Sequence, residues 1–214
     1  MPTRLPFDAL ARSLASAVFS LGANNRKNII RKRMPTLLTY TELRILGDRP
    51  DARAFFQKAS DLQGKNVFLS HTTKDDDLVP GVVLVLGNHG GRVYVDHQDP
   101  SVEGADCRAI AEHLREVMRQ CKRLVVLASP RSMDSKWIPW ELGLGDGLER
   151  QSHVALFPSA ESATDTAWSE REYFGLYQRI GWGRIEGRSE PCWVVWDHTK
   201  NTGETLVGWL LQAQ

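Results

Sequence analysis

The sequence predicts an α/β protein whose parallel sheet is covered by helices on both faces. Two observations carry this prediction: short, uniformly apolar runs that fit buried strands, and helical stretches between them. The runs are residues 66–70, 92–96, 123–129, 153–158 and 192–197. Because strands buried on both faces read as continuous apolar runs, we expect five parallel strands in the middle of three layers.

The intervening segments supply the helices. Residues 109–121 form a clear amphipathic pattern, with an apolar stripe made of Ile110, Leu114, Val117 and Cys121. Residues 80–87 are harder to assign, because their β-branched side chains favour a strand. The strand–helix alternation requires a helix there, and Pro80 is compatible with its first turn. We therefore predict a helix at 80–87.

Residues 1–64 differ from the rest of the chain. Apolar residues recur at helical spacing in 7–21, and 39–46 and 52–62 also have helical character. The basic segment 26–33 is interpreted as a solvated face rather than a phosphate or membrane contact, because the total charge is balanced. We predict an N-terminal helical extension at 1–64 and an α/β domain at 65–214.

Composition excludes several classes of function. The formal net charge of +1 argues against a nucleic-acid-binding protein. The three cysteines are widely spaced and form no metal-binding pattern with the six histidines, so we expect no metal and a reducing, cytoplasmic location. The apolar stretch near the N-terminus is too short to cross a membrane and makes a poor signal peptide.

Polar side chains follow three of the predicted strands. Ser70, Asp96 and Ser129 fall at their carboxyl ends, where open α/β sheets bind ligands. Further along, SKWIPWELG at 135–143 places Glu141 one helical turn after Trp137. In an arbitrary protein such a pair is more often packing and a solvated charge than a site.

Four segments in this order resemble the Toll/interleukin-1 receptor (TIR) domain family, particularly its bacterial members. They are VFLSHTTKDDDLV, VYVDHQD, RLVVLASPRSMDSKW and WIPWELG, and the match covers roughly residues 65–200. The resemblance implies a flavodoxin-like fold with a central parallel five-stranded sheet. It also implies, for many members, an enzyme that cleaves the bond between nicotinamide and ribose in NAD+, giving ADP-ribose or a cyclised isomer.

The resemblance assigns roles to individual residues. Glu141 occupies the position of the essential acidic residue, and Trp137 is the candidate for positioning nicotinamide. Ser135 belongs to the same motif. We expect Glu141 in the first turn of a helix, because Pro139 is tolerated only near a helix start, and there the helix dipole favours the carboxylate. Ionised in this way, it can stabilise positive charge that develops on the ribose.

Other positions are less determined. Ser70, His71 and Thr72 lie where the first loop approaches the ribose or phosphates, although some NAD-cleaving members carry arginine in this loop. Asp96 either contacts substrate or caps the following turn. The loop at 97–107 corresponds to one that, in several relatives, completes the active site of a neighbouring subunit, so self-association is expected.

The resemblance also leaves alternatives open. Relatives of this size act in Thoeris-type antiphage defence, where the cyclised product is a diffusible nucleotide signal that switches on a separate effector. We therefore expect NAD+ as a substrate and no resident cofactor. Other TIR domains are non-catalytic interaction modules, and a related N-glycosidase acting on free nucleosides or nucleotides is a third reading. The C-terminal tryptophans fit either a core or an assembly surface.

Overall fold

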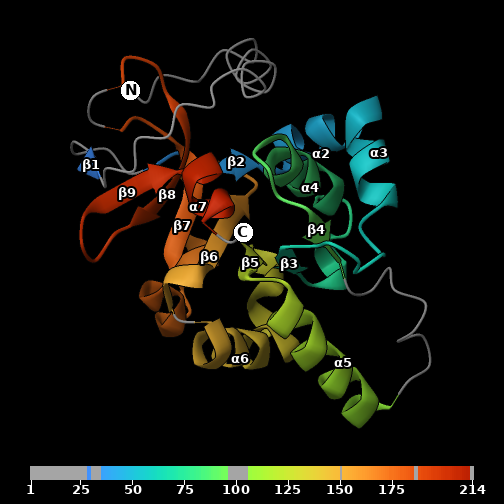
Figure 1. Ribbon diagram of the computed structural model, residues 1–214. Helices are drawn as coiled ribbons and strands as arrows, with labels where there is room; N and C mark the ends of the chain where they lie inside the picture. The colour runs from blue at the N-terminus through green and yellow to red at the C-terminus, as the bar shows by residue number, and fades with distance from the viewer. Residues whose placement is uncertain (1–27, 30–34, 96–105, 150, 186–187, 213–214) are drawn as a thin grey trace.

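A central parallel sheet organises the chain, as predicted. The computed structural model describes residues 28–29, 35–95, 106–149, 151–185 and 188–212 (Figure 1). The parallel strands are β3 (Val67–Ser70), β4 (Val93–Tyr94), β5 (Arg123–Ala128), β6 (Val154–Ala160) and β7 (Gln178–Gly183). Their order in space is β4-β3-β5-β6-β7, which is the flavodoxin-like order 2-1-3-4-5.

The fifth parallel strand is not the one we predicted. Residues 192–197 form β8 (Cys192–Asp197), which runs antiparallel to β7, and β7 itself was missed. Gln178, Arg179 and Gly181 interrupt the apolar pattern of β7, so it does not read as a buried strand. The connection from β7 to β8 spans only 184–191, too short for the crossover that a parallel pair needs.

Two further strands extend this antiparallel end of the sheet. They are β9 (Thr202–Thr205), which pairs with β8, and β1 (Asn28–Ile29), which pairs with β9. A short strand β2 (Leu38–Thr39) pairs in parallel with β6 off this path. The segment before residue 65 therefore contributes strands as well as the predicted helices. The helix that we predicted at 7–21 lies outside the described residues. So does the basic segment 26–33, apart from residues 28–29.

Helices cover both faces of the sheet, which makes the predicted three layers. On one side lie α2 (Tyr40–Gly47), α3 (Pro50–Gln57), α4 (Val79–Asn88) and α7 (Leu206–Leu211); on the other lie α5 (Cys107–Gln120) and α6 (Trp137–Glu149) (Figure 1). Side chains alternate between the two cores: Val67 and Leu69 of β3 pack in the first, whereas Phe68 packs in the second.

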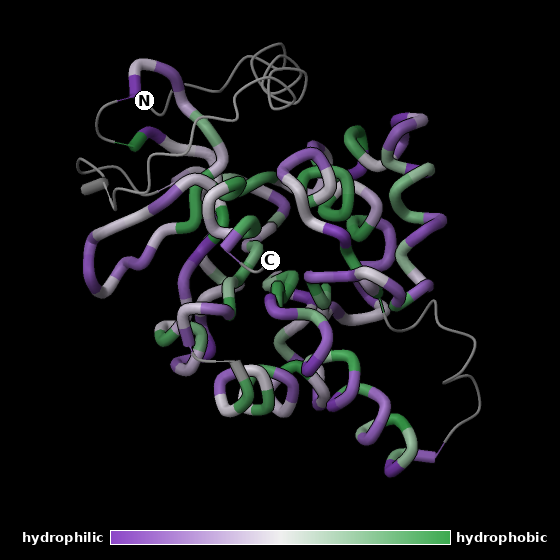
Figure 2. The backbone as a smooth tube through the Cα atoms, viewed as in Figure 1, coloured by the Kyte–Doolittle hydropathy of each residue, from purple (hydrophilic) through white to green (hydrophobic). Residues whose placement is uncertain are grey.

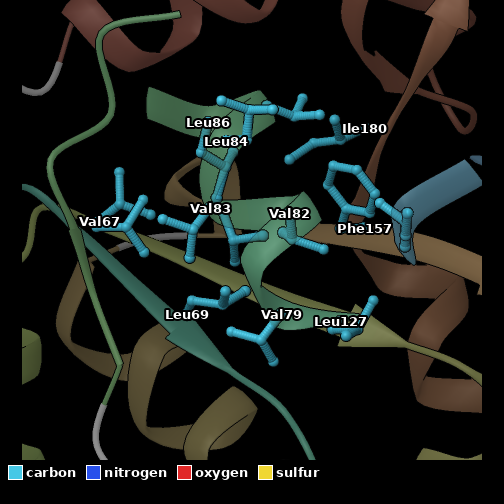
Figure 3. Close-up of a cluster of buried hydrophobic side chains, with 14 of the residues drawn as sticks. Val67, Leu69, Val79, Val82, Val83, Leu84, Leu86, Leu127, Phe157 and Ile180 are labelled. Carbon is cyan, nitrogen blue, oxygen red and sulfur yellow. The ribbon is translucent and has the colours of Figure 1, made fainter. Parts of the chain in front are cut away.

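The segment at 80–87 is a helix, as predicted, and its composition has a structural reason. α4 packs against the sheet on one side and against α2 and α3 on the other, so it is apolar all round (Figure 2). Figure 3 shows Val79 and Val82 of α4 gathered with Leu69, Leu127 and Phe157 of the strands. Burial on every side therefore decides this segment, and its β-branched residues do not make it a strand.

The helices of 40–57 are part of the main core. Leu43, Leu46 and Ala52 are buried in the same cluster as α4. Gly81 of α4 allows this close approach, because a Cβ atom there would lie 2.2 Å from the carbonyl oxygen of Leu43. The boundary that we drew at residue 64 therefore separates two parts of the chain that share one core.

The C-terminal tryptophans lie in the interior of the protein. All five are buried: Trp168, Trp182, Trp193, Trp196 and Trp209. Trp182, Trp193 and Trp209 belong to the core around α4, Trp168 belongs to the core on the other face of the sheet, and Trp196 lies in a small third cluster.

The helix α6 continues through the glycines at 143–147. Of these, only Gly145 has a close neighbour, Leu124 of β5. Within the described ranges, no helix has the length and apolar character needed to cross a membrane.

Candidate functional site

The topology places a switch point at the carboxyl ends of β3 and β5. These strands are neighbours, but the chain leaves them toward opposite faces: β3 leads to α4 and β5 leads to α6. Such a switch point opens a ligand-binding crevice in α/β sheets. Ser70 ends β3, and Ser129 directly follows β5, so the predicted edge of the sheet holds two of the three predicted polar side chains.

Two of the predicted site residues meet at this edge. Ser70 donates its hydroxyl hydrogen to Oε2 of Glu141, although the residues are 71 positions apart. Both side chains are buried, and Glu141 is only 4% exposed. A buried carboxylate is costly without hydrogen bonds, and Ser70 supplies one of them. An acidic side chain is thus held in a defined position at this edge of the sheet.

The start of α6 determines where Glu141 lies. The helix begins at Trp137, and Ser135 accepts a hydrogen bond from the backbone N–H of Ile138 at 3.3 Å. The Ser135 hydroxyl therefore caps the start of α6. Glu141 is the fifth residue of α6, so our prediction that it lies in the first turn is wrong. Proline is tolerated anywhere in a first turn, and Pro139 could not fix the helix start to one residue.

Trp137 and Trp140 differ in exposure. Trp137 is 39% exposed, whereas Trp140 packs against the core formed with α5. Their rings meet edge to face with centroids 5.6 Å apart, and the Arg115 guanidinium lies 5.5 Å from the Trp140 ring. Trp140 is therefore engaged in packing, and Trp137 is a partly exposed indole one turn before Glu141.

The first loop holds the remaining described candidates. The His71 side chain is 2% exposed, with Nε2 3.3 Å from an Asp76 carboxylate oxygen. Thr72 is half-buried and precedes the 3₁₀ turn η2 (Thr73–Asp75). Asp96 and most of the loop at 97–107 lie outside the described residues. The choice between a substrate contact and a turn cap for Asp96 therefore stays open.

A buried acid beside the site was not assigned a role from the sequence. Asp75 is fully buried, and the Ser129 hydroxyl donates a hydrogen bond to its Oδ2 at 2.5 Å. Burial raises the pKa of Asp75, while this hydrogen bond and the nearby Arg131 guanidinium act in the opposite direction. Its partner Arg131 was missed altogether, because a single arginine in a turn carries no sequence signal.

A cavity of about 180 Å³ lies at the opposite, amino-terminal edge of the parallel strands. Arg123 and Gln178, which begin β5 and β7, are among its lining residues. Its charged groups are engaged within the protein: Lys200 pairs with Asp197 at 2.7 Å, and Arg123 Nε donates to the Trp209 carbonyl. This cavity is therefore separate from Ser70 and Glu141.

Within the described residues, no three potential metal ligands gather in one place.

Comparison with known proteins shows the family of this chain. A family model described as the TIR domain matches residues 67–179, a little more than half of the chain. The chain belongs to the TIR domain family. It is also 34% identical over 132 residues to a protein of Bacillus cereus (strain MSX-D12) named "Probable 3' cyclic ADP-D-ribose synthase ThsB'". That alignment covers 60% of this chain and 67% of the relative.

For this TIR protein, the family match covers the part of the chain that carries the candidate site. The matched segment begins at β3 and ends within β7, so it spans the five parallel strands and the switch point between them. Before the matched segment, the chain adds β1, β2, α2 and α3. After it, the chain adds β8, β9 and α7. Ser70, Ser135, Trp137 and Glu141 all lie inside it.

Proposed function

We propose that this protein is an NAD+-cleaving TIR enzyme that releases nicotinamide and forms a cyclic isomer of ADP-ribose. The observation that carries the proposal is the buried Glu141, held by Ser70 at the switch point, with the exposed Trp137 one helical turn before it. The similarity to a protein named as a cyclic ADP-ribose synthase supports the cyclic rather than the linear product.

The reaction suits a site with one well-placed carboxylate. The nicotinamide ring of NAD+ is cationic, so it leaves with the electron pair of the C–N bond and needs no general acid. Positive charge then develops on the ribose, as in other glycosidic cleavages. A carboxylate held by fixed hydrogen bonds in a buried position stabilises that charge without having to reorient. Glu141 has this setting.

The second product depends on which oxygen captures the ribose carbon. Water gives ADP-ribose, whereas a hydroxyl oxygen of the same molecule closes a ring and gives a cyclic isomer. In either case the attacking oxygen forms the new C–O bond and loses its proton. Trp137 supports binding of the leaving group, because a cation over an indole face gains about 0.5 to 2 kcal/mol.

The biological role follows from the product. A cyclic nucleotide-like molecule can diffuse to a separate effector, so we propose a signalling role in antiphage defence of the Thoeris type. Self-association of the TIR domain is part of this proposal, as is a cytoplasmic location, where NAD+ is available. The three cysteines, none of which forms a disulfide, are compatible with that compartment.

The test is incubation of the purified protein with NAD+, followed by mass-resolved chromatography of the products. Glu141→Gln keeps the shape and removes the charge, so it should abolish nicotinamide release and still fold. Asp146→Asn is the matched control, because it removes another carboxylate from the same helix and should leave release unchanged. Retention and mass of the second product separate ADP-ribose from a cyclic isomer.

Other outcomes have defined meanings. Full activity of Glu141→Gln would refute the role of this carboxylate. Absence of release from the wild type, both alone and in lysate from phage-infected cells, would favour a non-catalytic interaction module. Stronger competition by free nucleosides or nucleotides than by NAD+ analogues would favour a related N-glycosidase.

A further inference from the structure

The candidate site is built from two separate arms of the chain. The first arm, residues 70–77, follows β3 and carries Ser70. The second arm, residues 129–137, follows β5 and leads directly into α6 and Glu141. Because Ser70 starts the first arm and Glu141 lies in the helix that follows the second arm, their hydrogen bond depends on how the two arms are held together.

Arg131 joins the two arms. It lies on the second arm, in the 3₁₀ turn η5 (Pro130–Asp134), and its Nη1 donates to two groups of the first arm. These are the carbonyl oxygen of Lys74 and Oδ1 of Asp77, both at 3.1 Å. The same nitrogen lies 3.8 Å from Oδ1 of the buried Asp75. One guanidinium therefore contacts three residues of the first arm, Lys74, Asp75 and Asp77.

The contacts of Arg131 argue against a role in binding the substrate's phosphates. A cation near this site could in principle bind the substrate's phosphates, as arginines do. Its guanidinium, however, already faces Asp75 and Asp77, and Nη2 lies 3.9 Å from Oε1 of Glu161. Anionic groups of the protein surround it, so an additional phosphate would have to displace them.

Tyr40 fixes the position of Arg131 from a third element. The Arg131 guanidinium lies over the Tyr40 ring, 4.4 Å from its centroid, and the ring is buried. Tyr40 is the first residue of α2, whose start is fixed by a capping box between Thr39 and Glu42. A ring held in this way gives the guanidinium a defined, partly desolvated surface to stack on.

We propose that Arg131 and Tyr40 are positioning residues that hold the two arms at the spacing that the Ser70–Glu141 pair requires. The proposal rests on the proposed function. It makes α2 part of the active-site framework, although Tyr40 lies outside the segment 67–179 that matches the TIR family. The N-terminal part of the chain thereby contributes to turnover without touching the substrate.

The test compares Arg131→Met with Arg44→Met. Arg44 also pairs with Asp77, at 2.7 Å, but it lies on α2 and does not connect the two arms. We expect Arg131→Met to lower kcat for nicotinamide release by about 10-fold or more, because small misplacements of reacting groups carry such costs. KM should change little, because Arg131 does not bind substrate. Arg44→Met should keep the wild-type kcat.

A second pair of variants tests Tyr40. Tyr40→Phe keeps the ring under the guanidinium, whereas Tyr40→Leu removes it, so kcat should fall further for Tyr40→Leu. Amide hydrogen exchange of the same proteins supplies a readout that does not depend on activity. Peptides covering 70–77 and 129–137 should exchange faster in Arg131→Met than in Arg44→Met.

The results separate this inference from the proposed function. If no protein releases nicotinamide but exchange increases as expected, the proposed function fails and the connection between the arms stands. If the wild type is active and Arg131→Met raises KM at an unchanged kcat, Arg131 binds substrate and the proposal is overturned. Equal exchange in the two arginine variants would also overturn it.

Discussion

The close approach of α2 and α4 can be tested with a single methyl group. In Gly81→Ala, the new Cβ would lie 2.2 Å from the Leu43 carbonyl oxygen and 2.9 Å from its carbonyl carbon. Ordinary carbon–oxygen contacts begin at about 3.3 Å, so the two helices must separate by about 1 Å. Both atoms of Leu43 belong to the backbone, and no side-chain rotation can relieve the contact.

The magnitude follows from two opposing effects. Overpacking of a close-packed core costs about 1–3 kcal/mol, and a backbone clash belongs at the upper end of that range. Replacing glycine by alanine within a helix returns about 1 kcal/mol. We therefore expect Gly81→Ala to lower the free energy of unfolding by about 2 kcal/mol.

Gly147→Ala is the matched control. It is the same substitution within a helix, but apart from the neighbouring backbone of that helix no atom lies within 4 Å of the added Cβ, so this variant should be more stable than the wild type. Urea denaturation followed by tryptophan fluorescence, with linear extrapolation, measures both variants. Gly81→Ala as stable as Gly147→Ala would refute the reasoning, because the helices could then not be as close as described.

Three further predictions concern individual side chains. Ser70→Ala removes a hydrogen bond to a carboxylate, worth about 1.5–3 kcal/mol, and should slow nicotinamide release by about 10- to 100-fold; an unchanged kcat would show that Glu141 does not need this donor. For Asp197, burial is outweighed by hydrogen bonds from the following turn, which lower its pKa from 3.8 to about 2. Its folded pKa is depressed, so its stabilisation is present above pH 3.8 and is lost as the pH falls toward 2. Asp197→Asn should therefore unfold more easily than the wild type at pH 7, by about 2 kcal/mol, and equally easily near pH 2; a difference that persists in acid would contradict this. Burial raises the pKa of the Cys121 thiol to about 12, so a thiol reagent at pH 8 should modify the exposed Cys107 and reach Cys121 only in denaturant, as mass spectrometry of peptides can show.

Part of the fold was predictable because burial leaves a pattern in sequence. The strands β3, β5 and β6 are covered on both faces, and each is therefore a continuous apolar run. The stripe on α5 likewise reports that one side of that helix packs against the core. The direction of β8 could not be read in this way, because a buried strand has the same composition whether its neighbour is parallel or antiparallel.

The candidate site was likewise predictable only in part from the sequence. Motifs alone identified Glu141, Trp137 and Ser70 as candidates and predicted the TIR family. The tertiary structure decided that Ser70 donates to Glu141, that Glu141 lies in the second turn of α6, and that Arg131 stacks on Tyr40. Sequence reports local periodicity and short motifs, whereas these contacts join residues 71 and 91 positions apart, and only the folded chain brings them together.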